Sequence, residues 1–167
     1  MTRSIICDLD GCLANDSERW RRAKKPDEPW EYVHYTEDSS FDWDTYFNHD
    51  LILEDGVNED LKQNLLRFYS RGWKIFYLTG RPEKIRHSTE QWLESNELSF
   101  HENLGMRLDN DFRPTETFKI YAIQKWQNLH EDYEWCLGFT DQPADLRAYE
   151  FCDIPGILWR AYVPGES

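Results

Sequence analysis

Two aspartates that follow a short apolar run are the residues of this sequence best suited to chemistry. The segment IICDLDG, residues 5–11, places Asp8 and Asp10 on alternate positions and follows them at once with a glycine. Two neighbouring carboxylates destabilise each other unless a positive charge lies between them. Mg²⁺ is a hard cation that takes carboxylate and carbonyl oxygens and often holds phosphate. The pair therefore predicts a Mg²⁺ site, and an aspartate is also able to attack phosphorus as a nucleophile.

Two further apolar runs end in residues that would complete such a site. The segment WKIFYLTGR ends in Thr79-Gly80-Arg81, and EWCLGFTD ends in Asp141. Asp141 would supply another oxygen ligand to the cation. Thr79 and the backbone amides around it would donate hydrogen bonds to phosphoryl oxygens as charge spreads in the transition state.

Two more residues take roles in phosphoryl transfer if Asp8 is the nucleophile. Such a mechanism needs a second acid that protonates the leaving oxygen and then activates water, and Asp10 is placed for both tasks. Lys119 lies near the start of the predicted helix 115–129 and would neutralise the phosphate and Asp8. The sequence therefore indicates phosphate-ester chemistry.

Apolar strands alternate with amphipathic segments along the chain, which predicts an α/β fold. This order is typical of a three-layer, Rossmann-like parallel sheet with helices on both faces. Right-handed crossovers then bring the carboxyl ends of all strands to one edge, where ligands of such sheets bind. The predicted strands cover 4–9, 73–80, 104–108, 134–141 and 156–163, and the predicted helices cover 57–71, 82–96, 115–129 and 143–151.

Composition excludes several classes of protein. The 167 residues, 40% of them hydrophobic, suit one folded domain, and no apolar stretch approaches the ~20 residues of a membrane span. The N-terminus lacks a signal-peptide core, so we expect a cytoplasmic protein. The four cysteines form no C-x-x-C pair, which argues against zinc.

Charge is strongly negative and unevenly spread. The net charge of −13 would repel the body of a long nucleic acid. The segment RWRRAKK, residues 19–25, nevertheless carries five basic residues and no acid, whereas residues 27–60 carry twelve acids and no Lys or Arg. Either this is a solvated basic turn beside an acidic surface, or it is a local anion clamp on a protein that otherwise repels phosphate.

The ordered segments ICDLDG, YLTGR, TFKIYAI and FTDQPAD together resemble the four motifs of haloacid dehalogenase-type phosphatases. The resemblance spans about residues 3–160. It implies that Asp8 is the nucleophile, Asp10 the acid/base, and Thr79 and Lys119 the phosphate-holding residues. It also implies Mg²⁺ bound by Asp8, by Asp10 through its carbonyl oxygen, and by Asp141. The family usually has Thr or Val at the position of Cys12.

A closer similarity is to the 3′-phosphatase half of bacteriophage polynucleotide kinase-phosphatases. That subfamily keeps a substrate-phosphate arginine at the position of Arg19, and its Ser-Gly-Arg matches Thr79-Gly80-Arg81. The stretch MRLDNDFRPTETFK, residues 106–119, also resembles the subfamily. The similarity implies that Gly80 and Arg81 bind the substrate together with Arg19, Arg107 and Arg113.

Two positions depart from the subfamily, and the kinase half is missing. The subfamily ends its last motif in Asp-Asp, whereas this chain has Thr140-Asp141 with Asp145 four residues on. Thr115 stands where the subfamily uses an acid shortly before the lysine. Asp145 either assists the metal site or only caps a helix or forms a salt bridge. No P-loop of the form G-x-x-x-x-G-K-[ST] occurs in the sequence.

Residues 15–55 break the alternating pattern just after the first motif, where this superfamily often inserts a cap. We expect one phosphatase domain over 1–167 with a small cap at 15–55, and a small cap implies a site open to polymer ends. Eight aromatic residues lie between Trp20 and Phe47. They form either the core of the insertion or, for one or two of them, a stacking platform for a nucleobase.

The sequence therefore predicts a Mg²⁺-dependent phosphomonoesterase with an aspartyl-phosphate intermediate. The expected substrate is a phosphorylated nucleotide or a nucleic-acid 3′ end, with a 3′-phosphatase of end repair favoured over a nucleotidase or small-molecule phosphatase. An alternative of another class is a non-catalytic binding module with the same fold. No membrane partner and no obligate protein partner are indicated.

Overall fold

A parallel five-stranded sheet forms the centre of the molecule in the computed structural model, which describes residues 1–24 and 41–163. The strand order is β5-β4-β1-β6-β7, and every pair of neighbours is parallel. The strands are β1 (Thr2–Cys7), β4 (Lys74–Pro82), β5 (Asn103–Arg107), β6 (Tyr133–Thr140) and β7 (Gly156–Leu158).

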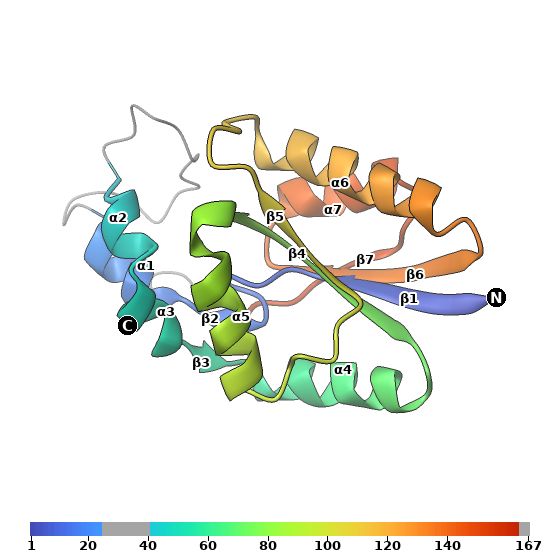
Figure 1. Cartoon of the computed structure of the whole chain (residues 1–167), viewed down its shortest axis with the longest axis horizontal. Coiled ribbons are helices and arrows are strands. Elements are labelled where there is room, and N and C mark those ends of the chain that lie inside the picture. The colour runs from blue at the N-terminus through green and yellow to red at the C-terminus, as the bar shows by residue number, and fades with distance from the viewer. Residues whose placement is uncertain (25–40, 164–167) are drawn as a thin grey trace.

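Helices cover both faces of the sheet, which confirms the predicted three-layer α/β architecture (Figure 1). One face carries α4 (Glu59–Ser70) and α5 (Arg86–Ser95), and the other carries α6 (Thr115–Leu129) and α7 (Pro143–Phe151). Both faces of the sheet are therefore buried, which is why its strands are apolar along their length instead of alternating with polar residues.

The alternation of side chains along each strand divides the core into two parts. In β1, Ile5 and Cys7 pack with the α4 and α5 side, whereas Ile6 packs with α6 and α7. Neighbouring β4 repeats the pattern, with Tyr77 on the first side and Phe76 on the second. Because successive residues of a strand point to opposite faces, one strand supplies both cores.

The described residues between β1 and α4 lie beyond the carboxyl ends of the strands (Figure 1). Among these residues, two short strands pair in antiparallel fashion and three short helices accompany them. These elements are β2 (Ala14–Asn15), α1 (Ser17–Ala23), α2 (Trp43–Tyr46), α3 (His49–Leu53) and β3 (Gly56–Val57).

Aromatic side chains form the core of this segment. The Phe41 ring lies 4.8 Å from Trp20 and 4.6 Å from Trp43, and Trp43 stacks on Phe47 at 5.4 Å. Tyr46 packs against all four rings. These five rings have a structural role. The other three predicted aromatics, Trp30, Tyr32 and Tyr35, lie outside the described residues, so stacking on a nucleobase stays a prediction.

Two predicted boundaries differ from the structure by more than two residues, each for a local reason. The helix expected from Pro82 begins later, because β4 continues to Pro82 and a 3₁₀ turn, η1 (Glu83–Ile85), precedes α5. The last strand ends at Leu158 instead of residue 163. Beyond it, Trp159 N–H donates to the Thr140 carbonyl and Ala161 N–H donates to the Gly11 carbonyl, so the chain crosses the edge of the sheet.

None of the helices in the described part of the chain is long and apolar enough to cross a membrane.

Candidate active site

Asp8 lies just after the end of β1, in the middle of the sheet. Its backbone N–H donates to the Phe139 carbonyl of β6 at 2.9 Å, which holds the residue at the edge where the strands end. One carboxylate oxygen accepts from Leu9 N–H at 2.9 Å and lies 3.1 Å from the Lys119 ammonium. Burial raises the pKa of Asp8 to about 7, although the charge of Lys119 opposes this rise.

Lys119, on the first turns of α6, is buried between two carboxylates. Its ammonium lies 2.5 Å from the Asp145 carboxylate, which also accepts a hydrogen bond from the Thr140 hydroxyl at 2.7 Å. Burial disfavours the charged ammonium, but Asp145 and Asp8 outweigh it and raise the pKa of Lys119. Asp145 thus anchors the lysine beside Asp8, and Lys119 keeps its positive charge.

Thr79 lies in the same edge region, at the end of the neighbouring strand β4. Its side chain is buried, and its hydroxyl oxygen accepts a hydrogen bond from Arg81 N–H at 3.2 Å. Within the described part of the chain, the Thr79 hydroxyl donates its proton to no hydrogen-bond acceptor. Because β1 and β4 are parallel neighbours, Thr79 and the half-buried Gly80 lie beside the Asp8 loop.

Asp141 follows β6 and is packed closely against Gly11. A Cβ on Gly11 would stand 2.3 Å from an Asp141 carboxylate oxygen, and Gly11 has a φ of +76°, so a glycine is required here. The same oxygen, Oδ2, accepts from the Gln142 side-chain amide at 2.9 Å, whereas Oδ1 is buried without a hydrogen-bond partner. Burial raises the pKa of Asp141, and the charge of Asp8 raises it further.

These features fit a Mg²⁺ ion held by few protein ligands. Asp8 and Asp141 repel each other, and the Oδ1 atom of Asp141 lacks a partner, as expected where a cation would bind. Within the described residues, no group of three His, Cys, Asp or Glu side chains is arranged to hold a metal. Two carboxylates with a backbone carbonyl and water match the usual sparse coordination of Mg²⁺.

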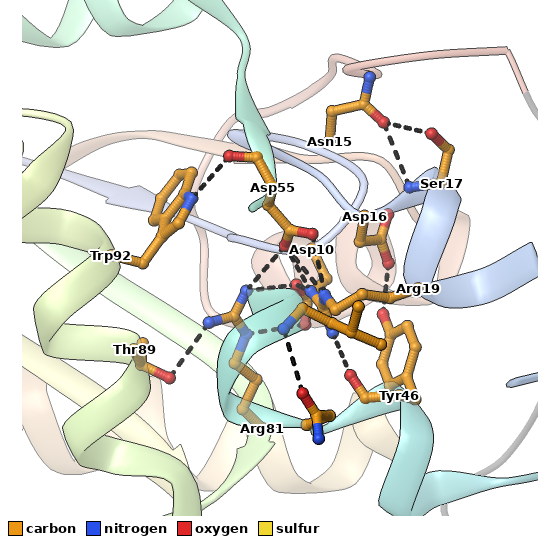
Figure 2. Close-up of polar contacts among 12 residues, drawn as sticks. Asp10, Asn15, Asp16, Ser17, Arg19, Tyr46, Asp55, Arg81, Thr89 and Trp92 are labelled. Carbon is orange, nitrogen blue, oxygen red and sulfur yellow. Dashed lines mark hydrogen bonds and ion pairs between the residues drawn. The ribbon is translucent and has the colours of Figure 1, made fainter. Parts of the chain in front are cut away.

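The Asp10 carboxylate points into a buried cluster of arginines (Figure 2). It accepts from Arg19 Nη2 at 2.5 Å, and from Arg81 Nη2 at 2.6 Å and Nε at 2.9 Å. Burial raises the pKa of Asp10, but the charges of Arg81 and Arg19 outweigh it and hold that pKa below its usual range. Any contribution of Asp10 to a metal site therefore falls to its backbone carbonyl.

Two acidic residues of this region, Asp55 and Asp16, were not identified as site residues from the sequence. Asp55 forms an ion pair with Arg19, and Asp16 accepts a hydrogen bond from the Tyr46 hydroxyl (Figure 2). Both carboxylates are buried. Asp55 belongs to the acidic stretch 27–60, and 36 residues separate it from Arg19, so only the folded structure distinguishes it from its solvated neighbours.

The remaining predicted arginines, Arg107 and Arg113, lie in or after β5. Buried Arg107 donates to the Gly80 carbonyl at 3.4 Å and to the Thr115 hydroxyl at 3.1 Å, which ties the loop after β4 to the start of α6. Arg113 is exposed and pairs with Asp111 at 2.6 Å. Substrate contact by either arginine stays a prediction.

The parallel sheet of order β5-β4-β1-β6-β7, with helices on both faces, is a fold that this chain shares with solved haloacid dehalogenase-like hydrolases. Solved structures confirm this resemblance. A predicted phosphatase from Clostridium acetobutylicum superposes with a TM-score of 0.70 at 18% identity, covering 95% of this chain and 84% of that one. A haloacid dehalogenase-like hydrolase from Streptococcus pneumoniae superposes at 0.63 and 16% identity, covering 94% and 84%.

Chains from the Pnkp1/Rnl/Hen1 RNA repair complex are also similar in structure. One superposes with a TM-score of 0.70 at 19% identity and another with 0.64 at 20% identity, each over 95% of this chain. The present chain spans only 45% and 42% of their lengths. No protein-family model and no curated protein matches the sequence itself.

Proposed function

We propose that this chain is a Mg²⁺-dependent phosphomonoesterase that acts through an aspartyl-phosphate on Asp8. The observation that supports this most directly is the position of Asp8. Its carboxylate lies at the carboxyl edge of the central strand, 3.1 Å from a buried lysine, within a fold shared with phosphatases. The ammonium stabilises the ionised Asp8 that attack requires and balances the charge of an incoming phosphate.

In the first step, an Asp8 carboxylate oxygen attacks phosphorus and the bond from phosphorus to the ester oxygen breaks. Asp10 gives its proton to that leaving oxygen. Asp10 is ionised in the structure, because Arg19 and Arg81 lower its pKa. A phosphate dianion beside it favours the protonated form, since like charges raise the pKa of a carboxyl group.

In the second step, a water molecule attacks the phosphorus of the aspartyl-phosphate. Asp10 takes a proton from this water, the bond between phosphorus and Asp8 breaks, and inorganic phosphate leaves. Thr79 and the Lys119 ammonium hold the phosphoryl oxygens in both steps. A Mg²⁺ held by Asp8, Asp141 and the Asp10 carbonyl would neutralise phosphoryl charge and draw the dianion to the site.

The substrate that we favour is the 3′-phosphate of a nucleic-acid end. Structural similarity to chains of an RNA repair complex supports this choice, as do the motifs around Arg19, Arg81 and residues 106–119. The chain acts as one domain in this proposal, with residues 15–55 as a small cap. That cap would border the site at the strand ends without enclosing a long polymer.

A second candidate is a phosphatase of mononucleotides or other small phosphoesters. The net charge of −13 favours it, because such a surface repels the body of a polynucleotide. The burial of three predicted substrate arginines, Arg19, Arg81 and Arg107, favours it as well, since their guanidinium groups already bind protein oxygens.

Replacing the nucleophile tests the proposed chemistry. Asp8→Asn keeps the size of the side chain but removes its nucleophilic oxygen, so we expect phosphate release to fall to the detection limit while the fold remains. Release would be measured over aryl phosphate, nucleoside monophosphates and 3′- or 5′-phosphorylated oligonucleotides, each with Mg²⁺ or with EDTA. Asp132→Asn, which changes an exposed carboxylate before β6, is the matched control.

The same screen separates the two substrate classes. Preference for the 3′-phosphorylated oligonucleotide, with a strong loss of rate at higher salt, supports a nucleic-acid end. Preference for mononucleotides without salt dependence supports the second candidate. Undiminished turnover by Asp8→Asn, or no release of phosphate from any substrate by the wild type, contradicts the proposed function.

A further inference from the structure

Each of the three guanidinium nitrogens of Arg19 donates at least one hydrogen bond within the protein. Its Nε donates to both oxygens of Asp55, at 2.9 and 3.0 Å, and its Nη2 donates to Asp55 at 2.7 Å and to Asp10 at 2.5 Å. Its Nη1 donates to the Tyr46 carbonyl at 2.7 Å, and its guanidinium lies 4.4 Å above the ring of the same residue. With 1% exposure, Arg19 has no face turned to solvent.

Arg81 approaches the Asp10 carboxylate from the core of the protein. Two of its nitrogens bind Asp10 in bidentate fashion, and its Nη1 donates to the Thr89 hydroxyl of α5 at 3.1 Å. Its Nη2 also lies 3.7 Å from Asp55. Two arginines and two aspartates therefore form a group with no net charge, in which Arg19, Asp55 and Arg81 are buried and Asp10 is partly exposed. We call it the ion quartet, consisting of Asp10, Arg19, Asp55 and Arg81 (Figure 2).

The ion quartet joins the insertion to the core at one catalytic side chain. Arg19 belongs to α1, and Asp55 lies in the turn after α3. Asp10 follows the central strand β1, and Arg81 belongs to the neighbouring strand β4. Asp55 is itself fixed, because its backbone carbonyl accepts a hydrogen bond from the indole of Trp92 at 2.9 Å. The orientation of the Asp10 carboxylate is therefore fixed by Arg19 of the insertion and by Arg81 of the core.

We infer that Asp55 is a positioning residue of the reaction, which holds Arg19 and Arg81 against Asp10 and so fixes the orientation of the carboxyl group that protonates the leaving oxygen. This inference rests on the proposed function. Arg19 and Arg81 then act on Asp10, and their guanidinium groups do not bind the substrate phosphate in this arrangement. A displaced Asp10 would still allow attack by Asp8 but would no longer deliver its proton.

Substrates whose leaving groups differ in basicity show whether Asp55 acts by positioning Asp10 or only by stabilising the fold. An aryl phosphate releases a phenolate that departs without a proton, whereas a 3′-phosphate releases a ribose or deoxyribose alkoxide that needs one. General acid catalysis typically contributes about 10²–10⁴-fold. In Asp55→Asn we therefore expect turnover of a nucleoside 3′-phosphate to fall about 10- to 100-fold more than turnover of p-nitrophenyl phosphate.

Two further variants keep the experiment decisive. Arg19→Lys retains the positive charge but cannot bind Asp55 through two nitrogens while also binding Asp10. It should therefore lower the ratio of nucleoside 3′-phosphate turnover to p-nitrophenyl phosphate turnover, and it serves as the test if Asp55→Asn does not fold. Gln127→Ala removes a side-chain hydrogen bond to the Cys152 carbonyl that involves no member of the ion quartet. It should leave the ratio of the two turnover rates near that of the wild type.

The outcomes separate this inference from the function on which it rests. An active wild-type protein whose ratio is unchanged in folded Asp55→Asn and in Arg19→Lys would show that the ion quartet is only structural. A rise in KM for both substrates with an unchanged ratio would instead assign Arg19 to substrate binding and overturn the inference. Absence of any phosphate release by the wild type would refute the proposed function and the inference together.

Discussion

The two oxygens of Asp141 have different environments. Oδ2 is held between Gly11 and the Gln142 amide, whereas Oδ1 is buried and unpartnered. A buried carboxylate oxygen without a donor is costly, and a cation is the partner that would satisfy it. The Gln142 amide binds one oxygen and would leave the other for the Mg²⁺ of the proposed function.

This role predicts that Gln142→Ala weakens Mg²⁺ binding. Loss of such an outer hydrogen bond typically costs about 10- to 100-fold in metal affinity. The fold should persist, because Gln142 precedes α7 without making a side-chain cap. Titration calorimetry with Mg²⁺ would measure the affinity, and Gln127→Ala, which removes another side-chain amide that binds the Cys152 carbonyl, serves as the control. An unchanged dissociation constant would contradict the role assigned to Gln142.

At the scale of elements, the loop between β5 and α6 depends on Arg107. Its guanidinium donates to the carbonyls of Asp111 at 3.0 Å and of Arg113 at 2.6 Å, besides its bonds to Gly80 and Thr115. Only a planar guanidinium, with several N–H donors in fixed directions, can donate to all of these acceptors at once. The start of α6, and with it Lys119, is therefore located by an arginine on the neighbouring strand.

We expect Arg107→Lys to loosen this loop. A lysine ammonium keeps the charge but leaves buried carbonyls without donors, at a cost of about 1–3 kcal/mol per unsatisfied group. The free energy of unfolding should fall by about that amount in urea denaturation, and amides at the start of α6 should exchange hydrogen faster. Arg113→Lys, which changes an exposed arginine, is the control, and equal stability of the two variants would contradict the prediction.

The elements that the sequence predicted best are those with strong apolar patterns. The segments at β1, β4, β6 and α6 carry long apolar runs or a clear helical stripe, and the structure places each of them as expected. The last strand was predicted too long, because its apolar residues Trp159 and Ala161 cross the sheet edge instead of extending it. Periodicity does not distinguish these two uses of apolar residues.

The candidate site divides in the same way. Residues at strand ends, such as Asp8, Thr79 and Asp141, were predictable because parallel strands bring their carboxyl ends together. Asp55 and Gln142 were not, since each matters only through the side chain that it contacts in the fold. The sequence also indicated Arg19 and Arg81 as polar site residues, but their burial against Asp10 is visible only in the structure.

For the whole molecule, buried carboxyl groups determine how stability depends on pH. Burial raises the pKa of Asp8 to about 7 and that of Asp55 to about 6, and it also raises the pKa of Asp141. These groups bind protons more tightly when the protein is folded. Their contribution to stability is therefore complete below the ordinary carboxyl pKa and is lost as the pH rises through 6 and 7.

We expect the metal-free protein to melt at a lower temperature at pH 8 than at pH 5. One pKa unit corresponds to about 1.4 kcal/mol, and about 1 kcal/mol shifts the melting temperature of a domain of this size by 2–4 °C, so the difference should be several degrees. Mg²⁺ should restore more stability at pH 8, where it binds ionised carboxylates. Scanning calorimetry with EDTA or Mg²⁺ would measure both effects.

Asp141→Asn provides the control for this pH dependence. It removes one repelling carboxylate, so the metal-free variant should lose less stability between pH 5 and pH 8, and it should gain little from Mg²⁺. A wild-type melting temperature that stays constant or rises over this interval without metal would show that the buried carboxyl groups do not control stability as argued.

The ion quartet also limits how residues 15–55 could be exchanged between related proteins. A graft that brought a foreign segment onto this scaffold without counterparts of Arg19 and Asp55 would leave Arg81 and Asp10 to satisfy each other alone in a buried place. Trimming the segment away would have the same effect. Single changes at exposed positions among the described insertion residues should therefore disturb this scaffold less than replacing the insertion as a module.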